Sequence, residues 1–308
     1  MDPGTTTAAP AGLARLLRGL LKSMRPKQWT KNIFVFAALI FDLKLFQTGV
    51  ALKSLAGFVI LCLLSSAVYL LNDSADVAAD RLHPRKSRRP IARGDVPVPV
   101  ALAVAAILAL GAIGAALALD PWFGLIAGVY ITQNLLYTLK LKHIVILDVI
   151  VLALGYVLRV AAGAALVRAD NFSPWLYLCA SLLALLLGFG KRRGELVTLG
   201  DKAGTRRILS EYSIPLLDQI ISIVTAALLV CYMLYTFNGT KLPHNNTFML
   251  TIPPVVYFVF RYLYLVHVRG EGGAPDELLL RDRPLQIAML LWGVTVVAVL
   301  YAARAGIG

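Results

Sequence analysis

The sequence predicts an all-α, polytopic membrane protein, a bundle of about nine transmembrane helices with an N-terminal amphipathic helix in the membrane interface. Three observations predict this fold class. Hydrophobic residues make up 58% of the 308 residues, and charged residues only 15%. The mean hydropathy is strongly positive, and the apolar residues form long runs. A soluble domain of this size cannot bury so much apolar surface in one core, so lipid is the expected solvent.

The expected elements follow in order along the chain. Residues 1–12 are expected to form a disordered tail. In residues 13–24, LARLLRGLLKSM, basic side chains alternate with leucines, as in a helix that lies in the membrane interface. Segments of about 20 apolar residues, long enough or nearly so to cross a bilayer, come next. They are 31–46 (the shortest), 52–72, 98–119, 122–139, 144–166, 174–190, 214–237, 248–268 and 284–303.

The positions of Lys and Arg predict the topology. With a cytoplasmic N-terminus, alternating these segments places 23 of the 30 basic residues inside and five outside. This bias agrees with the positive-inside rule. We therefore expect a multi-pass membrane protein with its N-terminus in the cytoplasm. Residues 13–308 are expected to form a single membrane-embedded catalytic domain.

Net charge and cysteine content narrow the function classes. A net charge of +13 in so apolar a chain favours anionic lipid headgroups and an anionic substrate over nucleic acid as partners. The three cysteines lie inside apolar runs, so neither a disulfide framework nor a zinc site is expected. The first 14 residues lack the apolar core of a cleavable signal peptide.

The densest charge follows the 52–72 segment, in NDSADVAADRLHPRKSRRPIARG. Its start, N-D-x-x-D-x-x-x-D, places Asp73, Asp76 and Asp80 within roughly 60° on one helix face. Stacked carboxylates repel one another unless cations neutralise them. Their oxygens are suitable ligands for an Mg²⁺ ion that is shared with substrate phosphates. We expect these three aspartates to be metal ligands and catalytic residues, with Asn72 orienting or binding beside them. The simpler interpretation, a solvated helix end, does not explain the alignment.

The loop after the aspartates is basic, with six Lys and Arg residues between positions 81 and 93. Arginine forks match phosphate oxygens, and about half of these side chains are expected to contact substrate, the others lipid headgroups. Arg81, Lys86 and Arg89 are the candidates. His83 lies in the same loop, where a lone histidine is more often solvated.

Two further constellations fall on the same expected face. YTLKLKHIVILD carries Tyr137, Lys140 and Asp148, and an unpaired carboxylate this far into a membrane helix would be costly. GKRRGEL has the composition of a phosphate clamp. The alternative interpretation is that these basic residues only follow the positive-inside rule or extend their side chains to the membrane interface. The remaining substrate-binding candidates come from GKRRGEL, from the N-terminal MRPKQWTKN and from the 248–268 segment: Lys191, Arg192, Arg193, Lys27, Lys31 and Arg261.

Because the three constellations share one expected face, they predict a single cytoplasmic site. The sequence contains neither a G-x-S-x-G elbow nor H-E-x-x-H nor a Walker A motif. What remains is magnesium-assisted chemistry on a phosphate or diphosphate, with a lipid partner that enters from the bilayer.

NDSADVAADRLHPRKSRRPIARG, YTLKLKHIVILD and the nine-segment pattern resemble the UbiA-type intramembrane prenyltransferase superfamily. Members usually carry a second D-x-x-x-D motif, but Leu152 stands four residues after Asp148 here. Together with RPKQWTKN and GKRRGEL, these stretches are most similar to the decaprenyl-phosphate phosphoribosyltransferase branch. That resemblance implies Mg²⁺-dependent transfer of 5-phosphoribosyl from phosphoribosyl diphosphate to decaprenyl phosphate, with release of diphosphate. The phosphoribosyl lipid would then serve as a precursor in cell-wall arabinogalactan synthesis.

Two alternatives stay open from the residues alone. A conventional prenyltransferase, with a prenyl diphosphate donor and a small aromatic acceptor, would use the same first motif. A transporter would need intramembrane charges along a path, whereas here the charges gather at one face.

In the phosphoribosyl mechanism, an adjacent carboxylate, with Asp148 as the candidate, would stabilise the ribosyl cation. A homo-oligomer is compatible with the sequence.

Overall fold

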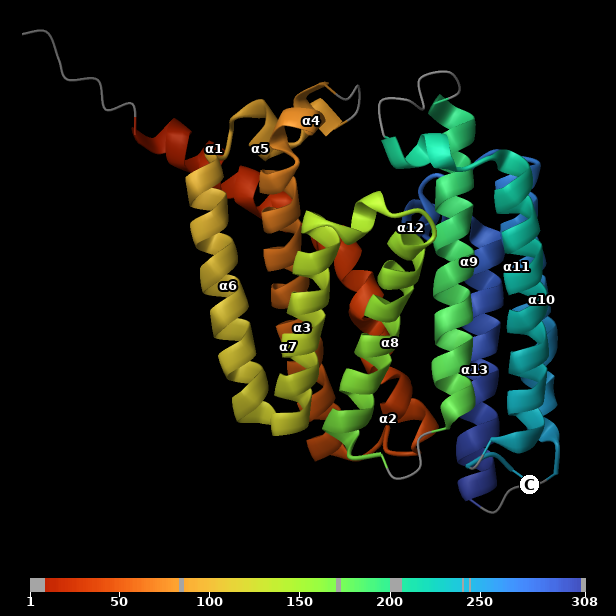
Figure 1. Cartoon of the computed structure of the whole chain (residues 1–308). Helices are drawn as coiled ribbons and strands as arrows, with labels where there is room; N and C mark the ends of the chain where they lie inside the picture. Colours follow the sequence, from red (N-terminus) through yellow and green to blue (C-terminus); the bar gives the residue numbers. More distant parts are fainter. Residues whose placement is uncertain are drawn as a thin grey trace, which may run out of the picture. The chain divides into compact units, whose positions relative to one another are not determined.

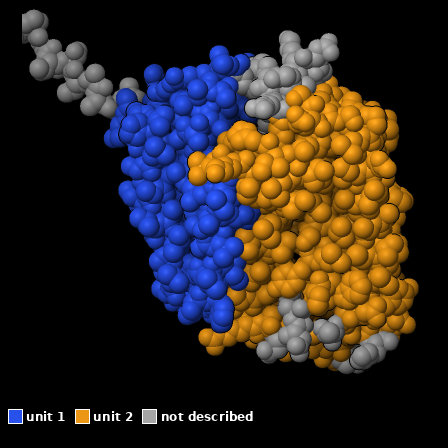
Figure 2. All heavy atoms as spheres, viewed as in Figure 1, with its two compact units in different colours: residues 1–33, 56–138 blue, residues 34–55, 139–308 orange. Residues whose placement is uncertain are grey.

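The computed structural model describes residues 9–82, 86–169, 173–199, 207–239, 241–243 and 245–305. Within these ranges the regular structure is entirely helical, as predicted (Figure 1). Residues 1–8 of the expected tail, and His83 of the basic loop, lie outside the described residues. The chain divides into two compact units, coloured separately in Figure 2. Unit 1 comprises residues 1–33 and 56–138, and unit 2 comprises residues 34–55 and 139–308.

Unit 1 is built from the N-terminal helices and the first long apolar helices. Their bounds are α1 (Ala9–Ser23), most of η1 (Pro26–Phe36), most of α3 (Thr48–Ala75), α4 (Val77–Leu82), η2 (Lys86–Arg88), α5 (Pro90–Arg93), α6 (Val98–Leu119) and α7 (Pro121–Leu139).

The α6–α7 connection is the single residue Asp120. Its Oδ1 atom accepts hydrogen bonds from the backbone N–H groups of Trp122, at 3.0 Å, and Phe123, at 3.3 Å. These bonds satisfy otherwise unpaired donors at the start of α7, while Pro121 needs no partner because it lacks an N–H. The helical hairpin therefore turns within one residue.

Helix α1 presents apolar side chains on two faces. Leu16 and Leu20 pack against the buried cluster of Leu70, Ile91 and Val96. The leucines of the other face are exposed, with 59% of Leu13, 52% of Leu17 and 59% of Leu21 accessible. A helix therefore covers residues 13–23 of the expected stretch and begins at Ala9, within the expected tail, while its place in the membrane interface stays a prediction.

Unit 2 contains the remaining long helices. Its elements are α2 (Ala37–Phe41), η3 (Leu141–His143), α8 (Leu147–Val167), α9 (Pro174–Leu199), η5 (Arg207–Glu211), α10 (Ile214–Asn238), η6 (Thr247–Thr251), α11 (Ile252–His267), α12 (Pro275–Arg281) and α13 (Arg283–Arg304). Helix α9 packs against both α8 and α10, and α11 packs against α13. A core of residues such as Leu186, Leu217 and Tyr262 joins α9, α10 and α11.

Seven helices of the described chain are long and apolar enough to cross a membrane. They are 48–75, 98–119, 147–167, 174–198, 214–238, 247–267 and 283–304. Helix α7, which has 19 residues and contains Gln133 and Asn134, is not among these seven. Leu110 of α6, Ile223 of α10 and Leu290 of α13 are 73%, 63% and 67% exposed. Such large exposed apolar side chains on long helices are typical of a lipid-facing surface.

The segment expected to span the membrane at 31–46 is not one α-helix. It consists of the end of the 3₁₀ helix η1, the five residues of α2 and a turn at Leu43, whose φ is +58°. The buried Asn32 donates its side-chain N–H to Ser65 Oγ and Cys62 Sγ of α3, both at 3.3 Å. Side-chain hydrogen bonds to a neighbouring helix thus hold this stretch, where hydropathy alone predicted a span.

The C-terminal end of this segment, residues 42–45, contacts Lys241 and helix α13. Lys44 Nζ lies 2.7 Å from the buried carboxylate of Asp42, and Lys241 pairs with the same carboxylate. Tyr301 Oη of α13 accepts a hydrogen bond of 2.9 Å from the backbone of Leu45. The α2–α3 turn of unit 2 is therefore fastened to residues that lie about 200 or more positions further along the sequence.

Candidate active site

The aspartates of the first motif lie at the end of α3 and in α4. The helix is interrupted only by a turn at Asp76, and the backbone N–H of Asp80 bonds to the Asp76 carbonyl at 2.8 Å. The motif therefore follows a nearly continuous helical path. The side chains of Asp73 and Asp80 are both only 2–3% exposed, so both need cationic partners.

Those partners come from both sides of the motif in the sequence. Arg89 Nη1 lies 3.0 Å from Asp73 Oδ1 and 2.5 Å from Asp80 Oδ2. Arg25 Nη2 lies 2.5 Å from Asp73 Oδ1, and Lys86 Nζ lies 3.8 Å from Asp80 Oδ1. We call these five residues the aspartate–arginine cluster. Two of its basic residues, Lys86 and Arg89, were expected from the sequence to bind substrate, and in this structure both pair with the aspartates.

Hydrogen bonds between η1 and α3 hold Arg25 close to the cluster. Trp29 Nε1 donates to Ser66 Oγ at 3.1 Å, and Ser66 Oγ donates to the Met24 carbonyl at 3.2 Å. Arg25 itself has a φ of +52°, and its guanidinium lies 4.7 Å from the centre of the Tyr69 ring. Sequence reasoning did not select Arg25 as a site residue.

The donor set of this region suits a hard divalent cation. Asn72 Oδ1 is buried and has no hydrogen-bond partner among the described residues, directly before Asp73. Carboxylate and amide oxygens are the ligands that Mg²⁺ prefers. Among the described residues, however, no group of three or more aspartate, glutamate, histidine or cysteine side chains is arranged to hold a metal ion. Basic side chains neutralise the aspartates here instead.

The other unit 1 candidates differ in position. Arg81 Nε donates to the Ala92 carbonyl at 3.1 Å, which ties α4 to α5. Lys27 is exposed on η1, and Lys31 and Tyr137 are half-buried. The substrate contacts of these four residues stay predictions.

In unit 2, Asp148 and Arg192 form a buried ion pair between α8 and α9. Arg192 Nε lies 2.6 Å from Asp148 Oδ2, with side-chain exposures of 2% and 0%. Arg192 Nη1 lies 2.6 Å from Glu195 Oε2, one turn further along α9. Two sequence candidates are thus brought together, and both are largely shielded from solvent.

Tyr212 completes this arrangement and was missed by the sequence analysis. Its hydroxyl donates to Asp148 Oδ1 at 2.7 Å and accepts the backbone N–H of Ile146 at 2.7 Å. Ile146 has a φ of +68°, which is strained for a β-branched residue. Burial and the hydrogen bond to Asp148 raise the pKa of Tyr212 well above its ordinary value of 10.0. The phenol therefore stays protonated and holds the strained turn before α8.

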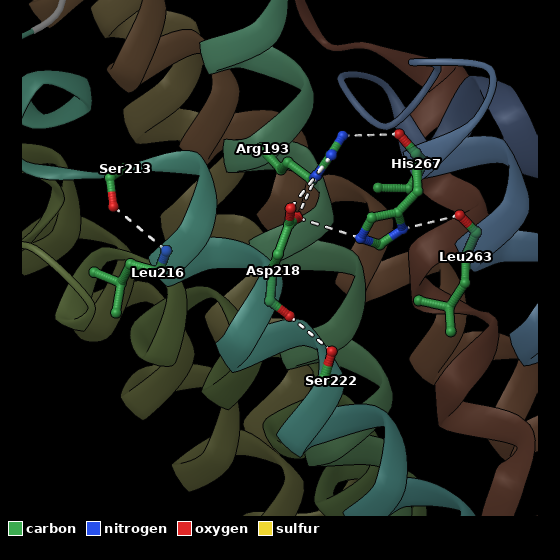
Figure 3. Close-up of polar contacts among 8 residues, drawn as sticks. Arg193, Ser213, Leu216, Asp218, Ser222, Leu263 and His267 are labelled. Atoms are coloured by element: carbon green, nitrogen blue, oxygen red, sulfur yellow. Dashed lines mark hydrogen bonds and ion pairs between the residues drawn. The ribbon is translucent and has the colours of Figure 1, made fainter.

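Arg193 faces another partner, shown in Figure 3. Its Nε lies 2.5 Å from Asp218 Oδ1 of α10, and its Nη1 donates to the Val266 carbonyl of α11 at 3.1 Å. His267 Nε2 lies 3.2 Å from the same Asp218 oxygen. Asp218 lies one turn into an apolar helix, so the cost of an intramembrane carboxylate could have flagged it. Arg193 thereby links α9, α10 and α11.

Arg261, expected near a buried phosphate, pairs with Asp282 at the start of α13. Its Nη2 lies 2.7 Å from Asp282 Oδ2, and Asp282 Oδ1 caps the helix by accepting the N–H of Leu285 at 2.9 Å. The Arg261 guanidinium lowers the pKa of the Asp282 carboxyl below its ordinary value of 3.8. Lys140 is exposed before η3, and Lys191 is half-buried on α9.

The glycines of GKRRGEL have a packing role. A Cβ atom on Gly194 would fall inside van der Waals distance of the backbone of Gly272 and Gly273, in the loop between α11 and α12. Only a glycine lets α9 approach this loop so closely. The motif therefore combines close backbone packing with the two arginines that bind partners on other helices.

The apolar helices and the buried charged clusters at their ends define a multi-pass, α-helical membrane enzyme. More particularly, the chain belongs to the UbiA prenyltransferase family, whose sequence model matches residues 33–274. The family expected from the motifs is thus confirmed, and with it the assignment as a transferase.

Relatives and solved structures agree with this membership. The decaprenyl-phosphate phosphoribosyltransferase of Mycolicibacterium smegmatis is 34% identical, and the alignment covers 96% of each chain. The enzyme of that name from Corynebacterium glutamicum is 33% identical, with 93% of this chain and 88% of the relative covered. A UbiA homolog from Archaeoglobus fulgidus bound to GPP and Mg²⁺ superposes with a TM-score of 0.70 at 19% identity, covering 92% of this chain and 99% of that one.

Proposed function

We propose that this protein transfers 5-phosphoribosyl from phosphoribosyl diphosphate to decaprenyl phosphate and releases diphosphate. The observation that carries the proposal is the near full-length similarity to decaprenyl-phosphate phosphoribosyltransferases, at 34% identity over 96% of the chain. The charge inventory supports it, because the donor has a 5-phosphate and a diphosphate, and the acceptor has its own phosphate. Three anionic groups require more cationic side chains than one prenyl diphosphate.

In the proposed mechanism, Asp73, Asp76 and Asp80 hold Mg²⁺, with Asn72 Oδ1 as an additional oxygen donor. Bound there, Mg²⁺ would neutralise charge that develops on the departing diphosphate. Arg25, a new candidate from the structure, joins the residues expected to orient the phosphates. Those residues are Lys27, Lys31, Arg81, Lys86, Arg89, Tyr137, Lys140, Lys191, Arg192, Arg193 and Arg261.

The proposed transfer does not require a general base. The acceptor phosphate is already ionised, so it can attack the anomeric carbon while diphosphate leaves from the opposite face, with inversion. Most of the rate would come from positioning and from fixed positive charge near the leaving group. Direct stabilisation of the ribosyl cation by Asp148 stays a prediction. The bonds of both Asp148 oxygens to Arg192 and Tyr212 favour a role in holding Arg192.

We also propose where the protein lies in the cell and how it crosses the membrane. Residues 13–308 form one catalytic domain with nine membrane spans in the bacterial plasma membrane, with α7 and the η1–α2 segment as the eighth and ninth. The N-terminus and the active site face the cytoplasm, where α1 lies in the interface among anionic headgroups. The product would enter arabinogalactan synthesis, and a homo-oligomer is compatible with this arrangement.

A second candidate is transfer of a prenyl group from a prenyl diphosphate to a small aromatic acceptor. It is favoured by the family and by the GPP-bound homolog of similar fold. Purified protein in detergent, given Mg²⁺, decaprenyl phosphate and radiolabelled phosphoribosyl diphosphate, separates the two. EDTA-sensitive label in the lipid phase supports the first. Turnover of a prenyl diphosphate without phosphoribosyl transfer would support the second.

Asp76→Asn tests the metal assignment. We expect it to abolish transfer while the protein stays folded and membrane-inserted, because the carboxylate is assigned to the metal rather than to packing. Asp95→Asn is the matched control, since Asp95 pairs with the exposed Arg93 and not with the cluster. Transfer by Asp76→Asn near the wild-type rate would contradict the metal assignment.

A further inference from the structure

A single nitrogen atom of Arg89 bridges two buried carboxylates. Its Nη1 is bonded to Asp73 Oδ1 at 3.0 Å and to Asp80 Oδ2 at 2.5 Å. Both carboxylates are only 2–3% exposed, whereas the Arg89 side chain is 25% exposed. The arginine therefore reaches in from the surface and lies where two acidic side chains of the motif converge.

The negative charges of the aspartate–arginine cluster are already neutralised. Asp73 and Asp80 carry two negative charges, and Arg25, Lys86 and Arg89, which pair with them, carry three positive charges. A divalent cation added to these aspartates would leave three excess positive charges in a largely buried place, which is costly. The excess is removed if a basic side chain withdraws and binds an incoming anion.

We propose that Arg89 is a stand-in cation, which occupies the oxygens of Asp73 and Asp80 until a divalent cation and an anionic phosphate group arrive together. Arg89 then leaves the aspartates and binds the phosphate oxygens. The inference rests on the metal assignment of the proposed function and deepens it. Arg89 suits this role because it follows the three-residue helix η2 and is partly exposed, and because guanidinium pairs equally well with carboxylate and phosphate.

The consequence is thermodynamic coupling between the two ligands. A ligand that raises the affinity of a second ligand by some factor has its own affinity raised by the same factor. The divalent cation alone should bind weakly because it competes with Arg89. An anion that binds the released guanidinium should strengthen cation binding.

Arg89→Gln tests the competition without any measurement of turnover. Mn²⁺ binding to the full chain in detergent micelles is measured from the EPR signal of free Mn²⁺, without phosphate compounds. We expect the variant to bind Mn²⁺ at least about tenfold more tightly than wild type, or about 1.4 kcal/mol. Arg93→Gln is the control, because Arg93 pairs with Asp95 and its side chain is 63% exposed. It should bind Mn²⁺ as wild type does.

Chemical labelling provides a second measurement on the wild-type protein. Phenylglyoxal modification of Arg89 is followed by peptide mass spectrometry. We expect Mg²⁺ to speed the labelling, because it releases the guanidinium, and added diphosphate to protect the side chain again. Labelling of the exposed Arg93 should change little under these conditions and provides the internal reference.

Several outcomes would overturn the inference. Arg89→Gln that binds Mn²⁺ no more tightly than wild type would show that Arg89 organises the aspartates and does not compete for them. Unchanged labelling with Mg²⁺ would exclude release. Failure of both proteins to bind Mn²⁺ would overturn the inference and the metal assignment together. If the tightening is observed but phosphoribosyl transfer is absent, only the proposed substrates are wrong.

Discussion

Replacing Asp148 by asparagine preserves the shape of the side chain and removes its charge. The carboxylate is fully buried and contacts Arg192 at 2.6 Å, and Arg192 is itself 2% exposed. Removing one partner of a buried ion pair typically costs about 3–5 kcal/mol. Glu195 still neutralises Arg192, at 2.6 Å, so the lower end of this range applies. The Tyr212 hydroxyl then donates to a neutral acceptor, which costs roughly another 1 kcal/mol.

Thermal unfolding in detergent measures this loss. For chains of 150–250 residues, 1 kcal/mol corresponds to a change in Tm of about 2–4 °C, so we expect Asp148→Asn to lower Tm by at least about 5 °C. Asp95→Asn is the control, because it breaks an exposed pair that is worth only about 0–1 kcal/mol. A Tm for Asp148→Asn within 1 °C of that control would refute the reasoning.

A double-mutant cycle then identifies what Asp148 does in the reaction. If Asp148 acts only by holding Arg192, then Asp148→Asn, Arg192→Gln and the double variant should lose the same factor in transfer rate. The double variant should also recover about 1–3 kcal/mol of stability relative to the sum of the single variants. If Asp148 contacts the reacting ribose, Asp148→Asn will reduce the rate further in the Arg192→Gln background.

Two further predictions concern packing and pH. Gly194→Ala should lower Tm and folded yield, because its Cβ would meet the backbone of the α11–α12 loop, whereas Gly114→Ala, with nothing within 4 Å, should not. The pKa of Asp282 is lowered in the folded protein, mainly by its hydrogen bond to Arg261, so its contribution to stability is complete above the ordinary value of 3.8 and lost as pH falls through the lowered value. The Tm difference between wild type and Asp282→Asn should therefore be constant near neutral pH and shrink below about pH 4; a difference that grows in acid would contradict the assignment.

Local patterns predicted the long helices well, because each depends on residues close in sequence. The 98–119 segment coincides with α6, and 214–237 ends within one residue of α10. The 31–46 segment is not the single α-helix that was expected, because hydropathy carries no information on the hydrogen bonds of Asn32 to α3. Such bonds exist only once two elements have packed.

The same distinction applies to the site. The spacing of Asp73, Asp76 and Asp80 predicted aligned carboxylates, and the basic loop predicted cations beside them. The identities of the partners were less accessible, since Arg25 reaches Asp73 from 48 residues away and Arg192 reaches Asp148 from 44 residues away. Tyr212 gave little signal, because a tyrosine after a polar loop has many ordinary explanations.

The fastening of the α2–α3 turn to the end of the chain has a consequence for biosynthesis. Tyr301 and Arg304 of α13 bond to the backbone of Leu45 and Leu43, and these contacts form only after α13 has been synthesised. Unit 2 therefore lacks these bonds until α13 has been made, whereas the buried Asp42 can already pair with Lys44, two residues away in the sequence. Truncation before Tyr301 should consequently produce an inserted chain that quality-control proteases degrade faster than the full-length protein.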